Sequence, residues 1–256
     1  MKVEGEKEEV DEKEREGKDR KALVALSPFS HAMHPKYYVR RTSKGFPITG
    51  NWNGDPWKGI PSIELKSYMG SRPEHFPKTQ VKLLWDNHFI YVIFRVEDRF
   101  VKAIARRYQD SVFQDSCVEF FFTPSHEISY GYFNIEVNCG GTMLFNFQRA
   151  PGVERKPISE SDARKIELFH SLPTIVDPEI SEPINWILEY RIPIEILTHY
   201  CEVVWPASKV RWRANFYKCA DRTSHPHWLT WAPVLYPRPN FHLPEFFGYL
   251  EFVEEI

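Results

Sequence analysis

The sequence has no long apolar run, and methionine is scarce, with 4 in 256 residues. A membrane-spanning helix needs about 20 consecutive apolar residues, and a secretion signal needs a shorter apolar core close to its start. The sequence as written contains neither. We therefore expect no membrane partner and a cytoplasmic location as written, or a periplasmic or extracellular one if a leader is missing from the printed start.

An excess of basic charge is also lacking. The chain has 35 acidic and 33 basic residues. Nine of the acidic and seven of the basic residues lie within residues 1–21, so the rest of the chain has 26 of each. A nucleic-acid-binding face needs clustered Lys and Arg, so we expect no nucleic-acid partner. The charged residues 1–21 cannot bury enough apolar surface to fold. We predict a disordered tail over 1–21 and a single, monomeric domain over 22–256.

Closely spaced cysteines are absent. The four cysteines form no CxxC motif and no cluster with zinc-finger spacing, so we expect buried, reduced thiols; they are Cys117, Cys139, Cys201 and Cys219. His225 and His227 stand two apart in "SHPHW" and could share one face of a strand. Nothing else in the sequence supports a metal there, so a surface pair is the favoured interpretation.

We expect no cofactor, although a structural calcium ion could add to the fold. Calcium prefers carboxylate and carbonyl oxygens in loops. Asp98, Asp110 and Asp115 could supply such oxygens, but the sequence has no compact calcium-loop signature.

Long helical periodicity is missing, and period-two alternation takes its place. "VKLLWDNHFIYVIFRVED" and "YFNIEVNCGGTMLFNFQ" predict two β-hairpins, and "DSCVEFFFTP" predicts another strand over about 116–123. Further strands are expected near 166–170, in "INWILEYRIPIEIL" before a helical turn, in "VRWRANFYKCADR" and in "FGYLEFVEE". Residues 22–38 are expected to be a loop. The fold class is all-β: an antiparallel β-sandwich, jelly-roll-like, with an immunoglobulin-like two-sheet architecture.

Polar residues collect on one face of several predicted strands. Residues two apart share a face, so Glu136 and Asn138 oppose the apolar side of "YFNIEVN", and Arg213 and Asn215 oppose that of "VRWRANFYK". Asn and Arg hold donors in fixed planes suited to directed hydrogen bonds. These faces are either a binding surface or a set of polar contacts beneath a covering loop.

Four segments together resemble the family 9 carbohydrate-binding modules. They are "DSCVEFFFTP", "FNIEVNCGGTM", "WRANFYKC…HWLTWAPV" and "FHLPEFFGYLEF", and the resemblance runs from about residue 38 to the end of the chain. It implies a β-sandwich that binds a mono- or oligosaccharide without cleaving it. A terminal sugar would lie between two aromatic side chains, with polar groups hydrogen-bonding its hydroxyls.

On this sequence the resemblance places the aromatic positions at Phe113 and Phe241 and the strand glutamate at Glu119. Both aromatic positions usually hold tryptophan in the family, and Glu136 stands where its pattern has an arginine. With the polar-face residues, the candidate binding set is Phe113, Glu119, Glu136, Asn138, Arg213, Asn215 and Phe241.

Other interpretations stay open at this point. Glu119 could instead pair with an arginine on a neighbouring strand, Phe113 and Phe241 could be ordinary loop-covering core, and Trp228 is expected to pack between sheet and loop. A glycoside-active enzyme would use Glu119 and Glu136 as an acid/base pair. A haem-binding sandwich would need methionine and histidine ligands, and the methionines at 33, 69 and 143 form no obvious haem pattern.

Overall fold

The computed structural model describes residues 34–254, all within one compact unit. The tail expected over 1–21 lies outside the described residues. Within 34–254 no helix is long and apolar enough to cross a bilayer. The strands are β1 Lys36–Arg41, β2 Ile63–Glu64, β3 Ser67–Tyr68, β4 Lys78–Trp85, β5 Phe89–Asp98, β6 Val101–Ala103, β7 Cys117–Thr123, β8 Tyr132–Asn138, β9 Met143–Gln148, β10 Lys156–Pro157, β11 Glu167–His170, β12 Val176–Ile180, β13 Ile184–Pro193, β14 Arg211–Cys219, β15 Trp228–Thr230 and β16 Gly248–Val253.

The helices of the described residues are single turns. They are the 3-10 turns η1 Val112–Gln114, η2 Ile128–Tyr130 and η3 Pro244–Phe246, and the α-helices α2 Glu160–Ala163 and α3 Ile194–Leu197. The predicted hairpins are confirmed as β4–β5 and β8–β9, and the helical turn after Pro193 is α3. Period-two alternation therefore located the main strands correctly.

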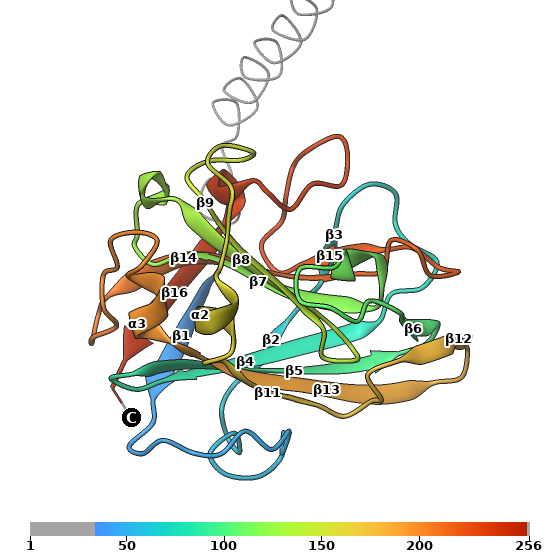
Figure 1. Ribbon diagram of the computed structural model, residues 1–256, viewed down its shortest axis with the longest axis horizontal. Coiled ribbons are helices and arrows are strands. Elements are labelled where there is room, and N and C mark those ends of the chain that lie inside the picture. Colours follow the sequence, from blue (N-terminus) through green and yellow to red (C-terminus); the bar gives the residue numbers. More distant parts are fainter. Residues whose placement is uncertain (1–33, 255–256) are drawn as a thin grey trace, which may run out of the picture. The chain divides into compact units, whose positions relative to one another are not determined.

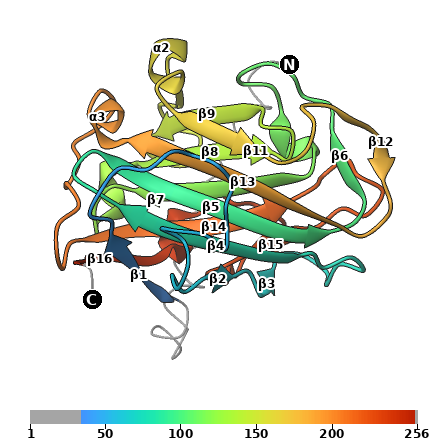
Figure 2. The same cartoon turned by 90° about the horizontal axis from the view of Figure 1, so that it is seen from below.

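Hydrogen bonds join 14 of the described strands into one mixed sheet, whose main path is β10-β9-β8-β7-β14-β16-β1-β4-β5-β13-β11. The half with β4, β5 and β13 lies beneath the half with β7, β8 and β14 in Figure 1, and crosses in front of it when seen from below in Figure 2. The sheet therefore curls into two layers.

Strand β1 departs from the prediction twice. It occupies part of the segment expected to be a loop, and it pairs in parallel with both β16 and β4. The mostly β class is confirmed, but the purely antiparallel pairing is wrong at β1. This strand joins the two layers, so the hydrogen-bonded sheet is continuous where two separate sheets were expected.

The apolar core lies between the two layers. Phe94 of β5 and Phe216 of β14 meet across it with ring centroids 6.1 Å apart, and both are fully buried. Since successive side chains of a strand alternate in direction, the odd-numbered residues of β14 and β7 point away from this core. That outer face carries the candidate site.

Candidate functional site

Four side chains form a row across the outer face of β14, β7, β8 and β9. The strand register aligns Tyr217 with Glu119, Glu119 with Glu136, and Glu136 with Leu144. Residues opposite each other in an antiparallel pair lie about 4.5–5.5 Å apart at Cβ. The two glutamates are therefore adjacent in the middle of the face.

A cavity of about 330 Å³ lies over this row. Phe113, Glu119, Glu136 and Phe241, four of the seven candidate residues, all line it. Further polar or aromatic lining residues, all of them outside the candidate set, are Phe121, Arg155, Asp221, Trp228, Asn240 and His242.

Loops supply the walls of the cavity. Phe113 lies in η1, just before β7, and Arg155 lies between β9 and β10. Phe241 belongs to the loop between β15 and η3, which is coloured red and arches away from the sheet in Figure 1. Strands β7 and β8 thus provide the acidic floor and β15 provides Trp228, while η1 and loops from distant parts of the sequence provide Phe113, Phe241 and Arg155.

Three of the aromatic side chains that line the cavity differ in exposure. Phe241 is 9% exposed and stacks on Tyr217, with ring centroids 4.0 Å apart and planes 10° from parallel. Trp228 and Phe113 are half-buried, and the Trp228 Nε1–H donates to Oδ1 of Asp221 at 2.8 Å. Phe113 and Trp228 therefore offer most of the accessible aromatic surface.

The two glutamates of the floor have few hydrogen bonds and no ion pair among residues 34–254. Glu119 is 2% exposed and accepts from the Cys219 thiol at 3.1 Å; Glu136 is 5% exposed and accepts from Nδ2 of Asn134 at 2.9 Å. Burial raises the pKa of Glu119 well above its usual value and that of Glu136 to about 7. A carboxyl group that holds its proton can donate as well as accept a hydrogen bond. The alternative in which an arginine pairs with Glu119 is not what the structure shows.

Asn138 is not among the residues that line the cavity. It is fully buried, donates from Nδ2 to Oδ2 of Asp115 at 2.8 Å, and accepts from the amides of Gly140 and Thr142. It lies on the outer face, as its parity predicted, but the β8–β9 turn and Asp115 use its hydrogen-bonding groups.

Arg213 and Asn215 are likewise covered by loops. The Arg213 guanidinium donates to the carbonyl oxygen of Phe247 at 2.6 and 3.0 Å, and Asn215 exchanges hydrogen bonds with the backbone of Ala232 at 2.8 and 3.1 Å. Both therefore hold the C-terminal loops against β14, and we leave them out of the site.

The three aspartates considered for calcium have separate partners. Asp110 accepts from the amides of Arg106 and Arg107, and Asp115 accepts from two backbone amides and Asn138. Asp98 is part of a different cluster, described next. The structure thus does not gather these three side chains around one point.

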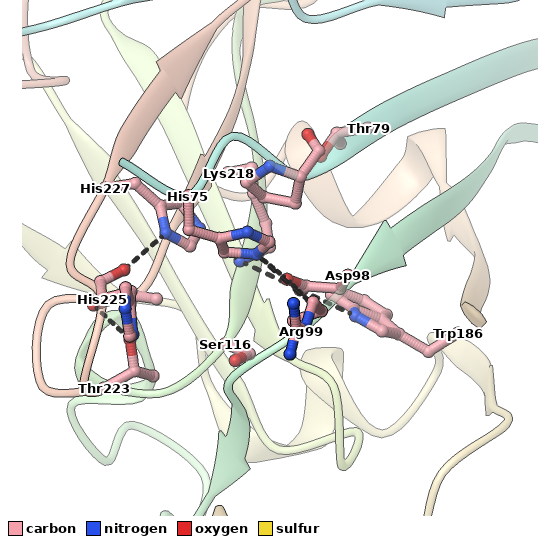
Figure 3. A network of polar contacts seen from close by, with 12 residues as sticks. His75, Thr79, Asp98, Arg99, Ser116, Trp186, Lys218, Thr223, His225 and His227 are labelled. Carbon is pink, nitrogen blue, oxygen red and sulfur yellow. Dashed lines mark hydrogen bonds and ion pairs between the residues drawn. The ribbon is translucent and has the colours of Figure 1, made fainter. Parts of the chain in front are cut away.

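A second buried charged cluster lies on the core side of β14. Asp98 is 3% exposed and contacts Lys218 Nζ at 3.5 Å, His75 Nε2 at 2.7 Å and Trp186 Nε1 at 3.1 Å (Figure 3). Although burial opposes it, the Lys218 charge and these hydrogen bonds hold the pKa of Asp98 well below its usual value.

His227 completes this cluster, which corrects the expectation of a surface histidine pair. It is 2% exposed, and its Nε2 lies 2.8 Å from Lys218 Nζ. Burial and the Lys218 charge lower the pKa of His227 to about 3, so the ring stays neutral and Nε2 can accept a hydrogen bond from the Lys218 ammonium. His225 instead stacks on Phe100, with centroids 3.6 Å apart.

Sequence reasoning missed several lining residues. Asp221 follows Cys219 by two positions, so continued alternation beyond the strand end could have placed it on the outer face. Arg155, Asn240 and His242 lie in loops without a periodic signal. Trp228 was expected to pack between sheet and loop, and the structure adds that it borders the cavity.

The comparisons with known proteins agree on one family. The model of "Carbohydrate-binding family 9" matches residues 58–252, whereas no curated protein sequence matches the chain. A Bacteroides uniformis structure, provisionally assigned as a carbohydrate-binding protein, is 26% identical with a TM-score of 0.76, covering 86% of this chain and 99% of that one.

Two structures of a family 9 carbohydrate-binding module from Caldicellulosiruptor kristjanssonii share the fold at 15% identity. One contains glucose, with a TM-score of 0.59 and coverage of 87% of this chain and 97% of that one. The other contains cellotriose, with a TM-score of 0.60 and coverage of 87% and 95%.

Proposed function

The chain belongs to carbohydrate-binding family 9, and we propose that the cavity above Glu119 and Glu136 binds a terminal sugar unit without cleaving it. The observation that carries this proposal is the convergence of Phe113, Glu119, Glu136 and Phe241 on one cavity. These residues come from segments up to about 130 positions apart in the sequence.

The chemistry of the cavity suits a sugar ring. A pyranose presents C–H groups on its faces and hydroxyls around its rim, so its site needs flat apolar walls and planar polar groups. We assign the wall contacts to Phe113 and Trp228, and the hydroxyl contacts to the Glu136 and Glu119 carboxyls together with Arg155 and Asn240. At about 330 Å³ the cavity is near the lower end of the range for ligand sites, which favours one or two sugar units.

A glycoside hydrolase is the alternative, because Glu119 and Glu136 are adjacent and have raised pKa values. Hydrolysis places two carboxyl groups on either side of the scissile bond. Here both rise from neighbouring strands of the same floor, so they approach a ligand from one side. That arrangement favours binding over cleavage.

Isothermal titration calorimetry with glucose, cellotriose and a panel of other mono- and disaccharides tests the proposal. We expect saturable binding of one ligand per chain, and Phe113→Ala should weaken it at least tenfold. Tyr38→Ala, which alters a 53% exposed ring on β1, serves as the matched control and should bind normally. An absence of heat across the whole panel would contradict the proposal.

Two further measurements separate the alternatives. Chromatography of cellotriose after prolonged incubation should show no cleavage, and release of glucose would favour the hydrolase. An absorbance scan should show no Soret band, and such a band would favour haem binding.

A further inference from the structure

Two cysteines and a glutamate meet at the floor of the cavity. Cys117 and Glu119 are two positions apart on β7 and so share its outer face, and Cys219 of β14 is the strand partner of Cys117. One thiol or carboxyl atom from each of the three lies within 4.8 Å of the others. The Cys219 thiol already donates to Oε1 of Glu119 at 3.1 Å.

This donor set suits a particular class of metal ion. Thiolates select soft or borderline cations such as Zn²⁺, whereas Ca²⁺ and Mg²⁺ prefer oxygen ligands. Zinc binds sulfur at about 2.3 Å, so two sulfurs at tetrahedral angles lie roughly 3.8 Å apart. The present separations of up to 4.8 Å need only small side-chain movements to reach that geometry.

The charge balance of the floor also favours a cation. Glu119 has no ion pair within residues 34–254, and its hydrogen bond comes from a thiol, which is a weak donor. Lys218, the neighbour of Cys219, points to the other side of the sheet and contacts Asp98 and His227. A buried acid without a cationic partner is costly, and a bound divalent ion would remove that cost.

The cavity leaves room for a further ligand. Glu119 and Cys219 line it, while Cys117 is fully buried beneath. Three protein ligands with a fourth position open to solvent is the arrangement of zinc sites that exchange their fourth ligand.

We propose that Cys117, Glu119 and Cys219 form a three-ligand site for a thiophilic divalent cation of the zinc class, with its fourth position facing the cavity. Binding replaces the protons of both thiols and the proton of the Glu119 carboxyl, all of which pass to the buffer, and the oxidation state of the metal does not change. The metal binds one oxygen of the Glu119 carboxylate, and its second oxygen remains available to a sugar hydroxyl together with Glu136, Arg155 and Asn240. The site goes beyond the sugar-binding proposal, and its test needs no sugar.

Cobalt(II) is the probe, because its tetrahedral thiolate complexes absorb in the near ultraviolet and the visible. The full chain, stripped with a chelator and kept reduced with a phosphine, is titrated with Co²⁺ and then with Zn²⁺. We expect charge-transfer and visible bands that saturate at one ion per chain and disappear as Zn²⁺ displaces the cobalt. A titration without these bands would overturn the proposal.

Matched variants locate the ion. Cys117→Ser and Cys219→Ser keep the shape of the side chain. Since loss of an outer-shell partner alone typically costs 10- to 100-fold in metal affinity, loss of a direct ligand should weaken Co²⁺ binding at least tenfold. Glu119→Gln should also weaken it. Cys201→Ser, at a half-buried cysteine outside the cluster, should leave the spectrum unchanged. Bands that persist unchanged in both serine variants would place the metal elsewhere and overturn the proposal.

A second measurement covers variants that fail to fold. Thermal unfolding of the unaltered protein is followed with and without Zn²⁺, since an ion that binds only the folded state raises the melting temperature. We expect a rise that the Cys201→Ser variant shares. No rise at a saturating Zn²⁺ concentration would contradict the site, and sugar binding without metal binding would overturn this inference alone.

Discussion

Two buried acids on either side of the layer formed by β7 and β14 have opposite surroundings: Asp98 reaches its core side from β5 of the facing layer, and Glu119 of β7 is on its outer face. Asp98 and Glu119 are almost equally buried, at 3% and 2% exposure. Asp98 contacts Lys218, His75 and Trp186, and its pKa is lowered. Glu119 accepts from a thiol, lies beside another acid, and its pKa is raised.

The difference separates structural acids from those available to a ligand. Burial alone would raise the pKa of both groups, so the opposite directions come from their partners. Asp98 has its hydrogen-bonding capacity filled within the fold, and its cluster stabilises the contact between β5, β13 and β14. Glu119 faces a cavity with capacity to spare. The acid without a cationic partner is therefore the one we assign to binding.

The largest expected effect is on stability. Lys218→Met leaves Asp98 buried without its cation and should lower the free energy of unfolding by about 3–5 kcal/mol, as for other broken buried pairs. Glu119→Gln removes no ion pair and should change it by less than about 1 kcal/mol. Urea denaturation measures both. Equal losses in the two variants would contradict the contrast between the clusters.

The next effect is on sugar affinity. Trp228→Ala removes about 1.5–3 kcal/mol of apolar contact if the ring covers a sugar, which is roughly a 10- to 100-fold loss of affinity. Trp205→Ala changes an indole that is 46% exposed and outside the cavity, so it should bind sugar normally. Calorimetry of the two variants side by side makes the comparison. A similar loss in both would argue against the assigned wall.

A pH dependence should follow from the Asp98 cluster. Unfolded His227 takes up a proton below about pH 6.5, whereas the folded residue does so only near its lowered pKa of about 3. Between these values His227 binds more protons in the unfolded state, so its contribution to stability falls as the pH drops from about 6.5 to 3, whereas the raised pKa values of Glu119 and Glu136 contribute in the opposite direction. Denaturant midpoints at several pH values measure this slope.

His227→Gln should remove the contribution of His227 and so change that slope. The matched control His126→Gln changes a histidine that is 63% exposed and lies beside Glu127, and it should keep the slope of the unaltered protein. If both variants retain the same slope, titration of His227 does not determine the acid sensitivity.

The smallest expected effect concerns the polar residues outside the cavity. Asn215→Asp keeps the size of the side chain but removes its donor to the Ala232 carbonyl. We expect a stability loss of about 1–3 kcal/mol from the unsatisfied buried group and less than a twofold change in sugar affinity. An affinity loss larger than that in Trp228→Ala would return Asn215 to the binding set.

Alternation predicted the main strands and the face that each of their residues takes. Glu119 and Glu136 were correctly placed on one face, because period two is a local property of the backbone. The same parity placed Asn138, Arg213 and Asn215 there, but it carries no information on which loop covers them. In the structure the loops around Ala232 and Phe247 take up Asn215 and Arg213.

Features that depend on pairing between residues far apart in the sequence could not be predicted. β1 is six residues long, and its partners β4 and β16 lie far away in the sequence, so neither its existence nor its parallel direction had a local signal. Lys218 is a comparable case. Alternation along β14 places its side chain on the core side, but only the fold shows that Asp98 and His227 contact it there.

A crystal soaked with the sugar that binds most tightly tests the central claim most directly. We predict density for one ring in contact with Phe113 and Trp228, with hydroxyls within hydrogen-bonding distance of the Glu136 carboxyl. A ring bound elsewhere, for example in the cavity lined by Arg106, Arg164 and His170, would contradict the account.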